Sequence, residues 1–176
     1  NVAHSFPHDA LPISEAAYRQ AIAIDPKYAR SWNGLGNLLQ DRLQRFEEAE
    51  AAYRQAITID PRYAIPWNGL GALLHDHLQR LDEAEAAYRQ AIAMDSKYVL
   101  PWANLARLCA TRERSSETAD CYRQVLGLAD GAQATTDIAT KAPILQAHLY
   151  LGNRAAAAAA LATISGQLDA QGRDGL

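Results

Sequence analysis

The residues of this chain whose types could do chemistry do not assemble into a catalytic or metal-binding motif. His75 and His77 are two positions apart. Side chains two apart on a helix point to different faces, so a shared metal ion would need a spacing of three or four. The G-x-G sequences that begin at Gly34 and Gly69 lack the third glycine and the preceding strand of a dinucleotide-binding loop. We therefore expect no metal ion, no cofactor and no catalytic residue.

The two cysteines also favour a structural role. Cys109 replaces a leucine of the core pattern described below and is expected to pack as a small hydrophobe, while Cys121 lies next to Tyr122. A reactive thiolate needs a basic neighbour that lowers its pKa, and the sequence indicates none. Two cysteines cannot form a disulfide scaffold, which favours reduced thiols and a cytoplasmic location.

Composition excludes several classes of protein. The 17 basic and 20 acidic residues give a net charge of −3, so no general attraction to nucleic acid or to an anionic membrane is expected. No apolar run approaches the ~20 residues that span a bilayer. Alanine, the strongest helix former, supplies 36 of the 176 residues. The composition therefore indicates an all-α protein.

An internal repeat provides the elements that must position any functional side chain. Trp32, Trp67 and Trp102 recur every 35 residues, and residues 29–63 match residues 64–98 at 24 of 35 positions. Such a fixed period is typical of solenoids and other repeat architectures. We therefore expect several copies of one small unit to stack along the chain.

Each unit is predicted to be a pair of helices. In the first unit Trp32, Leu35 and Leu39 share one helical face. A polar turn follows, and then a second apolar stripe that contains Tyr53. The sequence Asp60-Pro61 ends the unit, because proline cannot continue a helix. We expect Gly36 and Gly71, Ala49 and Ala84 to lie where helices cross closely.

These residues resemble the tetratricopeptide repeat, a helix–turn–helix unit of ~34 residues. The first unit matches the family pattern at eight positions: Trp32, Leu35, Gly36, Leu39, Ala49, Tyr53, Ala56 and Pro61. Two units carry one extra residue, which we place in the turn between the helices. The resemblance implies an α-solenoid of stacked antiparallel hairpins, wound as a right-handed superhelix.

The repeats also predict the domain boundaries. The array covers 14–130, as a half-unit at 14–28 and units at 29–63, 64–98 and 99–130. Residues 131–170 are expected to form a degenerate hairpin or cap, with Leu145, His148 and Leu149 on its inner face. Residues 171–176 are expected to be a disordered tail. Residues 1–13 fit no repeat and resemble the accidental translation of a sequencing adapter, so a non-native or disordered leader is expected, with a native flexible arm as the alternative. The first helix is expected to fray, or to pair with another copy of the chain.

A superhelix of this kind has a concave wall made by the first helices of its hairpins. The side chains on that wall should face away from the Trp/Leu/Gly stripe. We predict that they bind a partner: Arg30, Asn33, Asn37, Gln40, Ile65, Asn68, His75, Leu100 and Arg107. Three of the four such positions differ between the first two units. This variation indicates a surface specialised for a ligand, although neutral drift at exposed positions is the alternative.

The predicted function is a non-enzymatic scaffold that binds an extended protein or peptide in the concave groove. One branch of the family clamps a C-terminal carboxylate, but Asn33, Gly69, Leu100 and Asn104 stand where most of its clamp residues would be, so chaperone-tail binding is not predicted. The alternative function is a regulatory fragment of a larger enzyme, a glycosyltransferase or a kinase, with its catalytic domain outside this chain.

Overall fold

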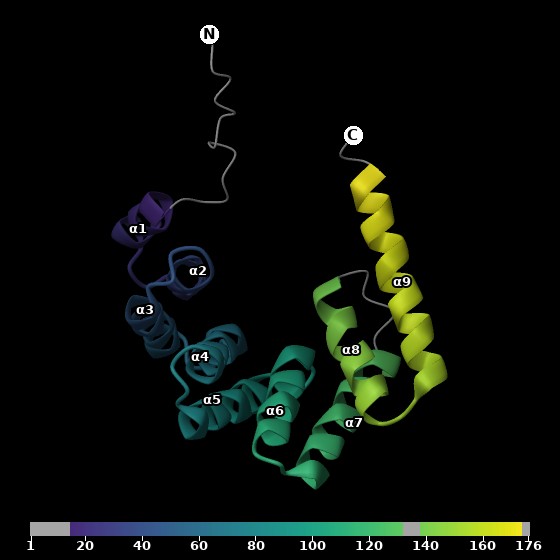
Figure 1. The fold of residues 1–176 in the computed structure, drawn as a ribbon. Coiled ribbons are helices and arrows are strands. Elements are labelled where there is room, and N and C mark those ends of the chain that lie inside the picture. The colour runs from purple at the N-terminus through teal and green to yellow at the C-terminus, as the bar shows by residue number, and fades with distance from the viewer. Residues whose placement is uncertain (1–14, 132–137, 174–176) are drawn as a thin grey trace.

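The computed structural model describes residues 15–131 and 138–173, which form helices and contain no strand. The all-α prediction is therefore confirmed. The helices lie along an arc, as Figure 1 shows. They are α1 (Glu15–Ile24), α2 (Ala29–Asp41), α3 (Phe46–Ile59), α4 (Ala64–Asp76), α5 (Leu81–Met94), α6 (Val99–Thr111), α7 (Ser115–Gly131), α8 (Ile138–Tyr150) and α9 (Arg154–Arg173).

The same local structure separates one hairpin from the next. The carbonyl of Asp60 accepts a hydrogen bond from the N–H of Tyr63 at 3.1 Å, and its carboxylate accepts one from the N–H of Arg62 at 3.0 Å. Asp95 repeats this geometry although a serine follows it instead of proline. An aspartate that bonds its own backbone two residues on is therefore sufficient to make the turn.

The turns inside the hairpins contain the extra residue that the repeat spacing predicted. Four residues separate α2 from α3 and α4 from α5, and three separate α6 from α7. In each turn one residue has a left-handed backbone: Gln44 has φ 52°, Gln79 has φ 54° and Glu113 has φ 58°. Glycine is the residue that adopts this conformation at least cost. These turns consequently store strain that a glycine would remove.

Glycines allow the tyrosines of α1, α3 and α5 to pack against the first helices. A Cβ atom added to Gly36 would lie 2.7 Å from the Tyr53 ring, and one added to Gly69 in the next hairpin would lie 2.8 Å from it. Tyr53 is 1% exposed, so its ring is held between the two glycines. The prediction that Gly36 and Gly71 lie at close helix crossings is confirmed, since Gly71 meets Tyr88 at 2.6 Å.

The first helices of the hairpins lie on the inside of the arc. Cα atoms of α2 and α4, and of α4 and α6, approach within 8 Å. Among the described residues no such approach joins α1 to α3 or α3 to α5. Figure 1 shows the same arrangement, with α2, α4, α6 and α8 turned toward the centre of the arc. The inner sides of α2, α4 and α6 are called the concave face below.

Helix α1 packs as the second helix of a hairpin although no first helix precedes it among the described residues. Tyr18 is half-buried, and a Cβ atom added to Gly34 would lie 2.3 Å from its ring. Ile24, by contrast, is 78% exposed. The expected self-association through α1 stays a prediction, and the non-native or disordered leader at 1–13 lies outside the described residues.

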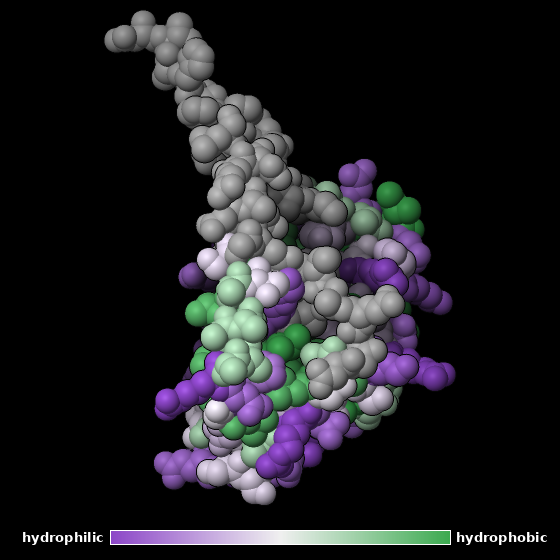
Figure 2. All heavy atoms as spheres, turned by 90° about the vertical axis from the view of Figure 1, so that its right-hand side faces the viewer, coloured by the Kyte–Doolittle hydropathy of each residue, from purple (hydrophilic) through white to green (hydrophobic). Residues whose placement is uncertain are grey.

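The C-terminal hairpin differs from its prediction in two respects. Leu149 of the predicted inner face is 61% exposed, whereas Ala147 of α8, which contains Pro143 in its interior, is buried. Helix α9 continues to Arg173, so three residues of the predicted disordered tail are helical. Figure 2, which looks onto this side of the molecule, shows apolar side chains over the C-terminal hairpin. The alanine run and the exposed Leu161 make this surface apolar.

Candidate concave binding face

The nine residues predicted to bind a partner lie on α2, α4 and α6, but they differ in accessibility. Asn33 and His75 are each only 7% exposed. First helices pack against one another on the inside of the arc, so side chains between them are covered, which the sequence did not reveal. The others remain accessible: Arg30, Asn37, Ile65 and Arg107 are exposed, and Gln40, Asn68 and Leu100 are half-buried.

The hydroxyl group of Tyr53 reaches the concave face from the second helix. It donates a hydrogen bond to Asn37 Oδ1 at 2.8 Å and lies 3.1 Å from Gln40 Oε1. Burial raises the pKa of Tyr53, and the nearby carboxylate of Asp41 raises it further. From its spacing, Tyr53 was predicted only as a packing residue. The role of its hydroxyl group was missed because Tyr53 and the glycines that contact its ring form a packing pattern in the sequence. That pattern does not indicate where the hydroxyl group lies.

Two asparagines join α4 to α6 on this face. Asn104 Nδ2 donates to Asn68 Oδ1 at 3.0 Å. Burial raises the pKa of Tyr98, and the Asn68 side chain lowers it, which places the phenol beside the amide. Each amide carries both a donor and an acceptor. Such groups can hydrogen-bond the peptide backbone of a ligand whatever its side chains are.

An ion pair also joins α4 to α6. Arg107 Nη2 donates to both carboxylate oxygens of Asp76, at 3.0 and 2.9 Å. His75 lies beside this pair, with its ring 6.4 Å from the ring of Tyr88 in an edge-on arrangement. Burial lowers the pKa of His75, so its imidazole is neutral at pH 7.

At the other end of the face, Arg30 is exposed and lies over an aromatic ring. Its guanidinium carbon is 5.9 Å from the centroid of the Tyr63 ring. Both residues belong to the first unit, because Arg30 lies in the first turn of α2 and Tyr63 is the last residue before α4. A guanidinium above an aromatic ring can still present N–H donors to a ligand.

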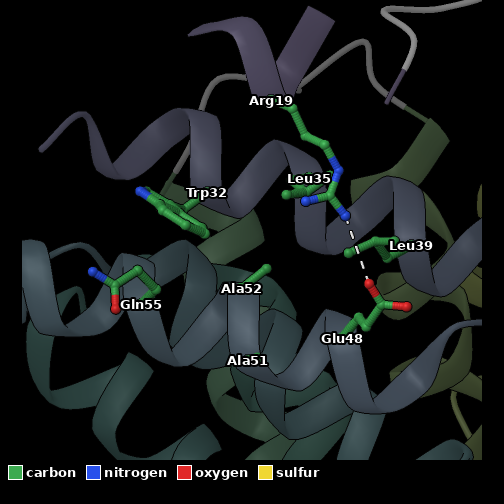
Figure 3. A pocket seen from close by; sticks show the side chains of 8 residues that line it. All are labelled: Arg19, Trp32, Leu35, Leu39, Glu48, Ala51, Ala52 and Gln55. Atoms are coloured by element: carbon green, nitrogen blue, oxygen red, sulfur yellow. Dashed lines mark ion pairs between the residues drawn. The ribbon is translucent and has the colours of Figure 1, made fainter. Parts of the chain in front are cut away.

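Open grooves also lie on the outer side of the arc, between successive second helices. One holds about 290 Å³ between α1 and α3. Figure 3 shows Trp32, Leu35 and Leu39 of α2 along this groove, with the charged groups of Arg19 and Glu48, 3.6 Å apart, beside Leu39. A groove between α5 and α7 is lined by the equivalent Arg89, Trp102, Leu105 and Gln124. Because its lining repeats with the scaffold, this kind of groove follows from the packing, whereas the concave face differs from unit to unit.

The groups considered for chemistry occupy structural positions. His77 stacks on Phe46 with ring centroids 4.3 Å apart, so the two histidines of the H-x-H sequence have separate surroundings. Burial raises the pKa of the Cys109 thiol and raises that of Cys121 to about 11. In the ranges that the structure describes, no group of three or more His, Cys, Asp or Glu side chains could hold a metal ion. No helix there is long and apolar enough to cross a membrane.

Comparisons with known proteins agree with this geometry. A family model described as TPR repeat matches residues 42–77, and two described as tetratricopeptide repeat match residues 17–51 and 66–98. A comparison with curated protein sequences found no match.

Similar solved structures share the fold at low sequence identity. A crystal structure of MamA is 16% identical with a TM-score of 0.59, over 90% of this chain and 89% of that one. The PilF structure from Pseudomonas aeruginosa is 19% identical with a TM-score of 0.62, over 83% of this chain and 64% of that one. YrrB, titled a TPR protein with an unusual peptide-binding site, is 18% identical with a TM-score of 0.61, over 88% of this chain and 76% of that one.

Proposed function

Because residues 17–98 of this chain are tetratricopeptide repeats, we propose that the array is a non-catalytic scaffold whose concave face binds an extended peptide or a partner helix. The observation that carries this proposal is the contrast between the two kinds of position. Packing residues repeat from unit to unit and are buried. Accessible residues of the concave face change, as from Asn37 to Ala72 to Arg107.

The dimensions of the face suit a short ligand. Neighbouring helices that pack together have axes roughly 8–10 Å apart, so α2, α4 and α6 present about 20 Å of inner surface. An extended peptide rises about 3.3 Å per residue, and six or seven residues would cross this distance. A site of that size is expected to bind with micromolar affinity, about −8 kcal/mol.

The side chains of the face supply the groups that peptide recognition needs. The amides of Asn37, Gln40 and Asn68 can hydrogen-bond a ligand backbone. Ile65 is 42% exposed and offers apolar contact area at the start of α4. YrrB, which has a similar fold, is described as having a peptide-binding site, which supports the same kind of ligand here. No described feature favours the alternative of an enzyme fragment.

Selection from a random dodecapeptide library on the immobilised chain tests this proposal. We expect enriched peptides whose affinity falls at least tenfold for a triple variant Arg30→Ala, Asn37→Ala, Arg107→Ala. A matched variant of the outer grooves, Gln55→Ala with Gln124→Ala, should bind them as the unaltered chain does. Equal binding to both variants, or no enrichment at all, would show that the concave face is not a peptide site.

A further inference from the structure

One ion pair on the concave face shows how an arginine side chain can bind an aspartate between two first helices. Arg107 of α6 crosses to α4 and binds Asp76 through both carboxylate oxygens. The two residues are 31 positions apart in sequence, and they join the first helix of one unit to that of the next. The pair stays partly accessible, with Arg107 44% and Asp76 38% exposed at their side chains.

One unit earlier, the position equivalent to Asp76 also holds an aspartate, but the position equivalent to Arg107 holds no basic residue. Asp41 ends α2 as Asp76 ends α4, and the residue 31 positions after Asp41 is Ala72. Asp41 is exposed. Within the part of the chain that the structure describes, no Lys, Arg or His nitrogen lies within 4.0 Å of its carboxylate. A carboxylate is therefore presented beside an alanine, where the next unit supplies a guanidinium.

The surroundings of Asp41 are rich in hydrogen-bond acceptors. The amide oxygens of Asn37 and Gln40 both face the hydroxyl of Tyr53, at 2.8 and 3.1 Å. The effect of Asp41 on the pKa of Tyr53 places the carboxylate near this group. A guanidinium has five N–H donors and no acceptor, and it binds carboxylates through two parallel hydrogen bonds. Lysine offers only a point charge and would satisfy fewer of these acceptors.

We propose that the concave face takes an arginine side chain of the peptide partner between α2 and α4, over Ala72 and against the carboxylate of Asp41. The inference rests on the proposed function, because it names the side chain that the groove recognises. The ligand arginine occupies the place that Arg107 fills one unit later. Charge complementarity selects the partner, since the site holds an unpaired acid and neutral acceptors.

A substitution that places an arginine side chain in the proposed site tests the geometry without any ligand. An Ala72→Arg substitution should pair with Asp41 as Arg107 pairs with Asp76. In a double-mutant cycle with Asp41→Asn, the pairing should raise the folding equilibrium constant by roughly 1.5- to 5-fold, the range of exposed ion pairs. Urea unfolding measures this value. A coupling of zero, or one of opposite sign, would show that position 72 does not reach Asp41.

Binding is tested with the pentapeptide acetyl-Ala-Ala-Arg-Ala-Ala-amide and its citrulline analogue, which keeps the shape but loses the charge. In NMR titrations we expect saturable shifts at the amides of Asn37, Asp41 and Ala72 with the arginine peptide. Binding should weaken at least fivefold with citrulline, with Asp41→Asn and with Ala72→Arg. Glu47→Gln, an exposed acid of α3 outside the concave face, should leave the affinity unchanged within about twofold.

The outcomes separate this inference from the proposed function. Equal binding of arginine and citrulline peptides, or arginine binding that survives both Asp41→Asn and Ala72→Arg, would overturn the inference. If the dodecapeptide selection still yields concave-face binders in that case, the peptide-binding function stands without an arginine subsite. A failure of the selection itself would overturn both.

Discussion

Removing one half-buried carboxylate should loosen the junction between the second and third units. Glu85 of α5 is only 15% exposed at its side chain, and it accepts from three arginines of different origin. Arg89 lies one turn further along α5 at 2.8 Å, while Arg112 and Arg114 come from the turn before α7 at 3.1 and 2.7 Å. We expect Glu85→Gln to destabilise the array, because it removes the charge on which these arginines converge.

The magnitude follows from the protonation of Glu85. Hydrogen bonding from Arg114 lowers the pKa of Glu85 from 4.5 to about 2, against the opposing effect of burial. One pKa unit corresponds to about 1.4 kcal/mol, so the shift sets an upper limit of about 3.5 kcal/mol. The arginines are partly exposed and screened by solvent. We therefore expect a loss of about 1–2 kcal/mol in the free energy of unfolding at pH 7.

The sign of the pH dependence gives a second check. A carboxylate whose folded pKa is lowered stabilises the protein above its unfolded pKa, and this contribution is lost as the pH falls toward 2. The difference in the free energy of unfolding between Glu85→Gln and the unaltered chain should therefore have its full value at pH 6 and decrease below pH 4.5. Urea unfolding followed by circular dichroism measures the free energy of unfolding of the two proteins at each pH, with the exposed Glu47→Gln as the matched control. A difference below 0.3 kcal/mol at pH 7, or one that does not change between pH 6 and pH 3, would refute the reasoning.

Three further outcomes are expected. Gln44→Gly should stabilise the chain by about 0.5–1 kcal/mol, since it relieves a left-handed residue in an exposed turn; a lower midpoint in urea would contradict this. Gly69→Ala should cost about 1–3 kcal/mol, because its Cβ would lie 2.8 Å from the confined ring of Tyr53. Gly127→Ala, which meets nothing within 4 Å, should be neutral or stabilising, and equal effects of the two would contradict the packing argument. Cys121, with its pKa raised to about 11, should react with iodoacetamide at pH 8 far more slowly than free cysteine, as mass spectrometry will show.

The hairpins and their packing residues could be predicted from the order of residues along the chain. Trp32 and Tyr53 recur at a fixed interval, and a helix converts such spacing into a face in a known way. Gly36 and Gly71 were predictable for the same reason, because they recur at one offset from the tryptophan in the first two units, whereas the contact of Gly69 with Tyr53 was not predicted. Nothing in this reasoning required contacts between distant residues.

Accessibility on the concave face depends instead on how neighbouring units approach one another. Asn33 and Asn37 both belong to the polar side of one helix, yet Asn33 is buried in the stacked array and Asn37 remains exposed. The pairing of Arg107 with Asp76, 31 residues away, likewise requires α4 and α6 to lie side by side. Local periodicity contains neither the distance between two helices nor the direction of a long side chain across the gap. For this reason the repeat was evident in the sequence, while the carboxylate of Asp41 emerged as an unpaired group only once the helices were stacked.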